Sequence, residues 1–276
     1  MTKICLAALV CACSVGSALG QVYDVTTDWS ELSNPSGAWT YRHGDVPLPH
    51  VTSWQRAAGG WTAAQPGWAR SEDANTRLPF WFKSNGSETF ANDFDPGDVV
   101  VHSTDAANGS GSGVASLAWT SPGYGTAKVE GAVWIGRDIG RSMNWRVVQG
   151  CTQYASGALA SGDVFSRANP ATFASGAASS GSLDGILVRA GSTIALELPT
   201  TSTSGDFVGV RFKVTFTSLQ PPCSADFNSD GFITFEDFDA FVSAFEQGLP
   251  TSDSNGDGCL DFTDFDDFVT ALESGC

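Results

Sequence analysis

The sequence predicts a mainly β fold: an antiparallel β-sandwich or jelly roll, followed by a small pair of α-helical repeats. Three observations predict this fold class. Residues 21–218 contain short alternating or β-branched segments, and these segments are separated by turn residues rather than by helical patterns. A short stretch with two prolines, 219–222, reads as a linker. From 223 to 276 the apolar period becomes helical, and one pattern occurs twice.

The first twenty residues are expected to be a secretory signal peptide. Lys3 precedes an apolar run over 4–15, and small residues follow before an expected cleavage at Gln21. A lipoprotein modified at Cys13 is the less favoured alternative. No stretch reaches the roughly 18 apolar residues of a transmembrane helix. We therefore expect a secreted protein with no transmembrane segment.

Seven segments of the first domain, 21–218, are expected to be strands: 98–103, 114–119, 126–135, 144–148, 185–188, 192–198 and 207–217. The last is expected to close the domain, and its period of two is the clearest. One of its faces carries Val208, Val210, Phe212, Val214 and Phe216, and the other carries Arg211, Lys213, Thr215 and Thr217.

Four cysteines remain after signal removal, and an exported protein permits disulfides among them in three pairings. Cys223 and Cys276 bracket the repeat, so we expect a bond between them. Cys151 stands alone in the larger domain and is expected to be a buried free thiol.

The negative charge is concentrated at the end of the chain. The net charge is −16, and residues 223–276 hold 13 acidic and no basic residues, against 17 acidic and 14 basic elsewhere. No basic stripe exists to displace counterions, which excludes nucleic acid as a partner.

Many of these acids fall at the spacing of calcium-binding loops, because calcium takes six to eight oxygen ligands from alternate positions around a sharp glycine turn. The first loop, 226–237, offers Asp226, Asn228, Asp230, the Phe232 carbonyl, Thr234 and Asp237, with Gly231 at the turn. The second, 253–264, offers Asp253, Asn255, Asp257, the Cys259 carbonyl, Asp261 and Asp264, with Gly258 at the turn. The pattern matches the EF-hand loop except for Asp in place of Glu at its last position. Two calcium ions are expected.

Each loop is followed by apolar residues at helical spacing, so two helices are expected to face each other. These residues are Phe235, Phe238, Phe241, Val242 and Phe245, then Phe262, Phe265, Phe268, Val269 and Leu272. Without a cation, mutual repulsion of the carboxylates would oppose folding of so small a unit.

Tandem loop–helix repeats with Asp at the twelfth position resemble dockerin repeats. The phrases DFNSDGFITFEDFDAFVSAF and DFTDFDDFVTALESGC resemble GC-type dockerin domains of exported proteins in planctomycete-like bacteria. The resemblance covers 223–276. It implies attachment to the cell surface or to an extracellular assembly through a cohesin-like or other docking protein. The matching docking positions are Phe235, Glu236, Val242 and Ser243, then Phe262, Thr263, Val269 and Thr270.

The first domain carries all nine tryptophans, which favours a polysaccharide ligand if some rings are exposed. We expect Trp119, Trp134 and Trp145 to be buried in strands. Trp54, Trp61 and Trp68 lie in a Gly- and Pro-containing stretch, and their exposure stays open.

Signatures of an enzyme are weak. There is no nucleophile elbow, and His43, His50 and His102 form no metal-binding motif. The acidic stretch 90–98 and the Glu72–Asp73 pair leave a polysaccharide hydrolase or lyase open, and 90–98 also leaves a further calcium site open. A structural surface-layer component is the third alternative. The expected function is non-catalytic attachment.

Overall fold

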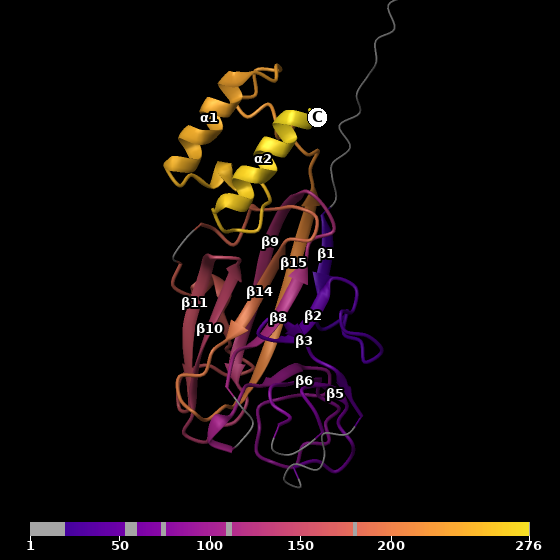
Figure 1. Cartoon of the computed structure of the whole chain (residues 1–276). Coiled ribbons are helices and arrows are strands. Elements are labelled where there is room, and N and C mark those ends of the chain that lie inside the picture. The colour runs from indigo at the N-terminus through magenta and orange to yellow at the C-terminus, as the bar shows by residue number, and fades with distance from the viewer. Residues whose placement is uncertain (1–19, 53–59, 73–75, 109–111, 179–180, 276) are drawn as a thin grey trace, which may run out of the picture.

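The computed structural model describes residues 20–52, 60–72, 76–108, 112–178 and 181–275. The expected signal peptide (apart from Gly20), Trp54 and Cys276 lie outside these ranges. The described chain forms two antiparallel β-sheets and two α-helices, and the helices lie beyond one end of the sheets (Figure 1).

The larger sheet has nine strands within the described residues. Their order is β12 (Ala171–Thr172), β9 (Gly125–Ile135), β15 (Phe207–Ser218), β7 (Val99–His102), β6 (Phe80–Lys83), β5 (Gly67–Ala69) and β4 (His50–Val51), while β1 (Gln21–Asp24) pairs with β15 and β13 (Ile186–Val188) pairs with β9. The smaller sheet has six described strands, β11 (Thr152–Ala160), β10 (Ser142–Gln149), β14 (Thr193–Leu198), β8 (Ala115–Thr120), β2 (Trp39–His43) and β3 (Val46–Pro47).

The two sheets share one apolar core, which gives a sandwich-like arrangement. Large aromatic rings bridge them: the ring centroids of Trp39 in β2 and Phe212 in β15 are 5.2 Å apart. In β15 the alternation expected from the sequence is confirmed, since Val208, Val210, Phe212, Val214 and Phe216 are all buried. We refer to residues 21–218 as the sandwich.

All seven predicted strands are present, with bounds shifted by a residue or two. β15 is the last strand of the sandwich, and it lies in the interior of the larger sheet between β9 and β7. The sequence did not predict β1 to β6, β11 or β12. Three short 3-10 helices complete the described elements: η1 (Ala106–Asn108), η2 (Phe173–Ser175) and η3 (Pro250–Ser252).

The C-terminal unit, 223–276, contains helices α1 (Phe235–Glu246) and α2 (Phe262–Ser274). They meet along a seam of phenylalanines in which the rings of Phe241 and Phe268 stack with centroids 4.0 Å apart. The first phenylalanine of each apolar stripe is excluded from the seam: Phe235 is 71% exposed and Phe262 is 80% exposed. The expectation that the whole stripe is buried is therefore wrong at these two positions, because each begins its helix on the outer side.

In the part of the chain that the structure describes, no helix is long and apolar enough to cross a membrane.

Candidate metal centre

The two loops of the C-terminal unit are folded alike. In loop 1 (226–237) the Asp226 carboxylate accepts the backbone N–H groups of Asp230 and Gly231, each at 3.0 Å. In loop 2 (253–264) the Asp253 carboxylate accepts the equivalent N–H groups of Asp257 and Gly258, at 3.2 and 3.0 Å. The first acidic residue therefore closes each loop around its glycine turn.

The glycine at the sixth position is required by the backbone. Gly231 has a φ of 87° and Gly258 a φ of 84°, in the left-handed region that other residues rarely adopt. This turn reverses the chain so that the third and fifth positions face the same side as the first, which is the arrangement a calcium loop needs.

The twelfth position links each loop to its helix. Asp237 accepts the N–H groups of Asn228 at 3.1 Å and Thr234 at 2.8 Å, and Asp264 repeats both bonds with Asn255 and Asp261. Thr234 and Asp261 in turn cap α1 and α2. One carboxylate thus ties the beginning of the loop to the beginning of the helix.

These twelfth-position carboxylates are buried without a basic partner in their unit. Asp237 and Asp264 are both 0% exposed, and residues 223–276 contain no Lys or Arg. The N–H groups of Thr234 and Asn228 hold the pKa of Asp237 below its usual value, so this carboxyl stays ionised. Burial raises the pKa of Asp253, although the N–H groups of Gly258 and Gly256 oppose that rise.

The donor set fits a calcium ion because every ligand expected from the sequence is an oxygen. The residues that would hold the two ions are Asp226, Asn228, Asp230, Phe232, Thr234 and Asp237, then Asp253, Asn255, Asp257, Cys259, Asp261 and Asp264. Among the described residues, His, Cys, Asp and Glu side chains form no group of three or more arranged to hold a metal ion. Calcium binding therefore stays a prediction.

Side chains of the sandwich hold loop 2 through hydrogen bonds to the backbone of the loop. Gln149 at the end of β10 donates to the Gly256 carbonyl at 3.0 Å, and Ser192 donates to the same oxygen at 2.8 Å. Thr152 at the start of β11 donates to the Gly258 carbonyl at 3.0 Å. A pocket of about 540 Å³ lies along this junction and is lined by both parts.

A disulfide between Cys151 and Cys259 joins the same two elements, with Cα atoms 5.0 Å apart. The prediction of a buried free thiol at Cys151 is therefore wrong. Cys151 lies exposed in the β10–β11 turn, and no sequence pattern places that turn beside residue 259. Cys223 is also disulfide-bonded, and its expected partner, Cys276, lies outside the described residues.

Sequence reasoning missed the residues that hold loop 2: Gln149, Thr152 and Ser192. Their side chains are ordinary polar groups with no spacing that signals a contact. The one available signal was Cys151, because a single cysteine outside the repeat of an exported protein needs a partner.

The described tryptophans of the sandwich are not exposed for stacking on sugars. Trp119, Trp134 and Trp145 are buried in strands, as predicted, and Trp61 and Trp68 are buried as well. Among the described residues, no tryptophan is exposed. Trp54 lies outside the described ranges.

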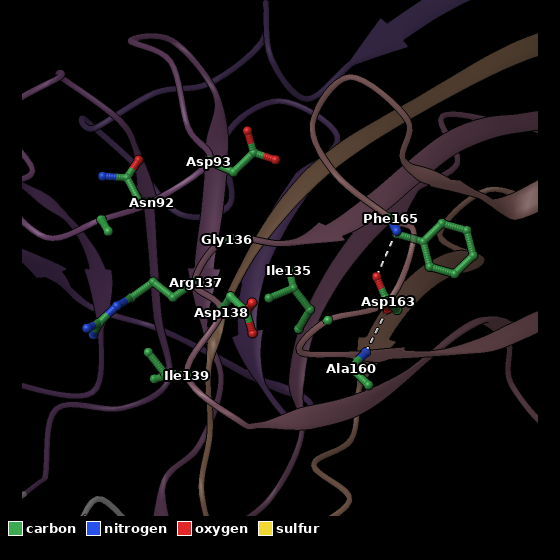
Figure 2. A pocket seen from close by; sticks show the side chains of 12 residues that line it. Asn92, Asp93, Ile135, Gly136, Arg137, Asp138, Ile139, Ala160, Asp163 and Phe165 are labelled. Atoms are coloured by element: carbon green, nitrogen blue, oxygen red, sulfur yellow. Dashed lines mark hydrogen bonds between the residues drawn. The ribbon is translucent and has the colours of Figure 1, made fainter.

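A pocket of about 380 Å³ opens where the β9–β10 and β11–β12 connections meet (Figure 2). Asn92, Asp93, Arg137, Asp138 and Phe165 are among its lining residues. Asp163 also lines it, and its carboxylate accepts the N–H groups of Ala160 at 2.8 Å and Phe165 at 2.7 Å. These two hydrogen bonds help to shape the β11–β12 connection.

The carboxylates of the acidic stretch 90–98 share one distant arginine. Arg167 pairs with Asp95 and Asp98 at 2.6 Å each, and its backbone N–H donates to Asp93 at 2.6 Å. The alternatives of a catalytic acid pair or a calcium ion here stay predictions, because one guanidinium offsets only one of these three negative charges.

The three histidines have structural contacts. His43 bonds the Ser112 carbonyl at 2.9 Å, and His50 packs edge-on against Trp68. His102 bonds the Ser103 carbonyl, and burial lowers its pKa to about 4.

Comparisons with protein-family models, with curated proteins and with solved structures found no match for this chain.

Proposed function

We propose that this chain is an exported, non-catalytic protein that is held on the cell surface or in an extracellular assembly by its C-terminal unit. In this proposal the unit is a dockerin-like pair of calcium loop–helix repeats that binds two ions. The observation that carries the proposal is the pair of buried carboxylates, Asp237 and Asp264, in duplicated all-oxygen loops with no basic residue in the unit. Divalent cations would balance this charge.

The distribution of exposed aromatic rings supports docking through the C-terminal unit. Phe232 and Phe235 are each 71% exposed and Phe262 is 80% exposed, whereas the largest aromatic rings of the sandwich are buried. Exposed phenylalanines on a small unit are typical of protein interaction surfaces. Here they lie at two places, because the Phe262 ring centroid is 6.4 Å from that of Phe245, at the opposite end of α1 from Phe235. Carboxylates surround them, so the docking partner, cohesin-like or otherwise, is proposed to present an apolar surface bordered by Lys or Arg.

For the sandwich we propose a polysaccharide or another extracellular ligand, bound through polar loops rather than through exposed tryptophans. The pocket in Figure 2 supports this choice, because it combines an amide (Asn92), carboxylates (Asp138) and a phenyl ring (Phe165) on one concave surface. A hydrolase or lyase, or a surface-layer component, would replace this part of the proposal if the tests below favour them.

The calcium claim is tested on the full chain by isothermal titration calorimetry after removal of calcium. Two ions are expected to bind, and the helical circular dichroism signal is expected to fall in chelator and to return with calcium. The paired variant Asp226→Asn/Asp253→Asn is expected to bind none. Unchanged helicity in chelator, together with no heat of binding, would refute the claim.

The attachment claim is tested by comparing surface-bound and released protein in the producing cells. The variant Phe232→Ser/Phe235→Ser/Phe262→Ser is expected to be released into the medium, and the control Leu32→Ser alters an exposed residue of the sandwich. Equal retention of both variants would contradict docking through these rings. A polysaccharide panel, scored for binding and for released reducing ends, separates a binding module from an enzyme.

A further inference from the structure

We propose that the sandwich is a built support for the second calcium loop, so that loop 2 binds calcium more tightly than loop 1 and keeps it longer. This inference rests on the proposed calcium binding and deepens it. The support consists of the β10–β11 turn, Gln149 to Thr152, together with Ser192 at the start of the β14 segment.

The support acts on the backbone between the ligand positions. Gly256 and Gly258, whose carbonyls accept the sandwich hydrogen bonds, are the fourth and sixth residues of loop 2. The expected ligand Asn255 precedes Gly256, and the expected ligand Asp257 lies between the two glycines. Fixing these two peptide groups therefore limits the rotation of the third and fifth ligands, which is how groups around a metal site raise its affinity.

The disulfide fixes the next ligand. Cys259 is the seventh residue of loop 2, and its carbonyl is an expected ligand while its Sγ is bonded to Cys151. A covalent bond at this side chain restricts the conformations open to the same residue's carbonyl. Three consecutive ligand positions, 255, 257 and 259, are thus held from outside the loop.

The fit between turn and loop is close. A Cβ added at Gly150 would overlap the Asp257 carbonyl, and one added at Gly258 would overlap the Gln149 carbonyl. Gly256 is buried, and the side chain of Arg189 covers it. Small residues on both sides let the two backbones approach each other, so the contact extends along the loop rather than resting on a single bond.

Loop 1 has no such support. In the described part of the chain, loop 1 makes no hydrogen bond, ion pair, ring contact or disulfide with the sandwich, and Asp230 to Glu236 are exposed. At the seventh position it carries Phe232, directed to solvent, where loop 2 carries the disulfide-bonded Cys259. Loop 1 therefore bears alone the conformational entropy that is lost when it binds an ion, and this cost reduces its affinity relative to loop 2.

The experiment isolates each site in the full chain. Asp226→Asn leaves loop 2 as the only intact site, and Asp253→Asn leaves loop 1. Calcium affinity is measured by titration calorimetry at fixed ionic strength. Loop 2 is expected to bind at least about tenfold more tightly than loop 1, the lower end of the effect of groups that support metal ligands.

The support is then removed in both backgrounds with Cys151→Ser/Cys259→Ser and Thr152→Val. Loop 2 is expected to lose about tenfold in affinity, while loop 1 changes less than about twofold and serves as the internal control. Tryptophan fluorescence checks the fold, since all nine tryptophans lie in the sandwich. If the cysteine variant does not fold, Thr152→Val alone is expected to weaken loop 2 severalfold.

Equal affinities in the two backgrounds, or an affinity gap that survives removal of the support, would overturn the inference and leave calcium binding intact. An absence of calcium binding in both backgrounds would overturn the proposed function and the inference together. The two failures are therefore distinguishable.

Discussion

Loop 1 and loop 2 have the same internal structure and different surroundings. Six equivalent hydrogen bonds differ in length by at most 0.2 Å between them. Yet loop 1 faces solvent, while loop 2 is bonded to the sandwich through three side chains and a disulfide. Local sequence thus determines the geometry of each loop. Contact with the sandwich determines whether a loop is supported or faces solvent.

The difference also gives the two repeats different roles: the second contacts the sandwich, and the first stays accessible. In loop 2 the seventh position carries Cys259, which is bonded to Cys151 of the sandwich, whereas Phe232 at this position in loop 1 faces outward. The sandwich therefore uses one edge of the second repeat and leaves the first repeat accessible.

The seam between the helices should be equally important to both repeats. Truncating a phenylalanine in it should have the largest effect on unfolding free energy. Phe241 and Phe268 are equivalent in the two repeats, are buried and stack on each other. Phe241→Ala and Phe268→Ala are each expected to cost about 3–5 kcal/mol of the unfolding free energy of the C-terminal unit. Urea unfolding followed by helical circular dichroism, with calcium present, measures both. A difference above about 2 kcal/mol would show that the repeats are unequal in the core as well.

Opening the Cys151–Cys259 disulfide should weaken the contact between loop 2 and the sandwich and leave loop 1 unchanged. The bond spans 108 residues, and removing a native disulfide typically costs about 2–5 kcal/mol. In Cys151→Ser/Cys259→Ser we expect the helical signal to be lost at lower urea than the tryptophan signal, because the C-terminal unit then unfolds separately. Coincident transitions at the wild-type midpoint would show that the disulfide adds nothing to the contact.

A change at the remote end of the sandwich should leave both loops unaffected. Asp206 is buried beside Phe207 at the beginning of β15, and its Oδ2 has no hydrogen-bond partner among the described residues. Burial raises the pKa of Asp206 to about 6, so the folded state gains stability as pH falls from about 6 to 4. His102, with its pKa lowered to about 4, acts in the opposite direction over the same range.

Removing one of these two groups leaves the pH dependence of stability that the other contributes. Asp206→Asn is expected to lose roughly 2–3 kcal/mol of stability relative to wild type as the buffer goes from pH 8 to pH 4, because only the opposing histidine remains. Thermal unfolding followed by tryptophan fluorescence across this range measures the slope. At pH 8 the calcium affinities of both loops should equal those of wild type, and a change in either would mean that the sandwich transmits strain along its length.

The smallest expected effect is on stability at the seventh position of loop 1. Phe232→Ser replaces a ring that is mostly exposed, so it should change unfolding free energy by less than about 0.5 kcal/mol. It should still reduce surface retention of the protein, which a structural residue would not do without destabilising the unit. A loss of more than about 2 kcal/mol would place Phe232 in a packed environment.

Sequence patterns predicted the elements whose signals are local. The alternation of 207–217 and the helical stripes of the C-terminal unit reflect burial on one face, and both are found. The strand β11 was missed because its residues, TQYASGALA, are mostly small and polar, and pairing with β10 alone makes them a strand. The short strands β3 and β4 have two residues each, too few for any period.

The candidate site divides in the same way. The spacing of the expected ligands within each loop is local, so it could be predicted from the sequence. The contact between residues 149–152 and 256–259 joins segments more than 100 residues apart, and only the fold brings them together. Likewise, no sequence pattern showed that Arg167 would pair with Asp95 and Asp98.

The disulfide has a mechanical consequence. A load pulling on the C-terminal unit reaches the sandwich at two points: the linker that leaves β15, and Cys151 between β10 and β11. β15 belongs to the larger sheet and the β10–β11 hairpin to the smaller one. Tension is therefore shared between both sheets at the end nearest the helices (Figure 1), rather than stripping a single terminal strand from the sandwich.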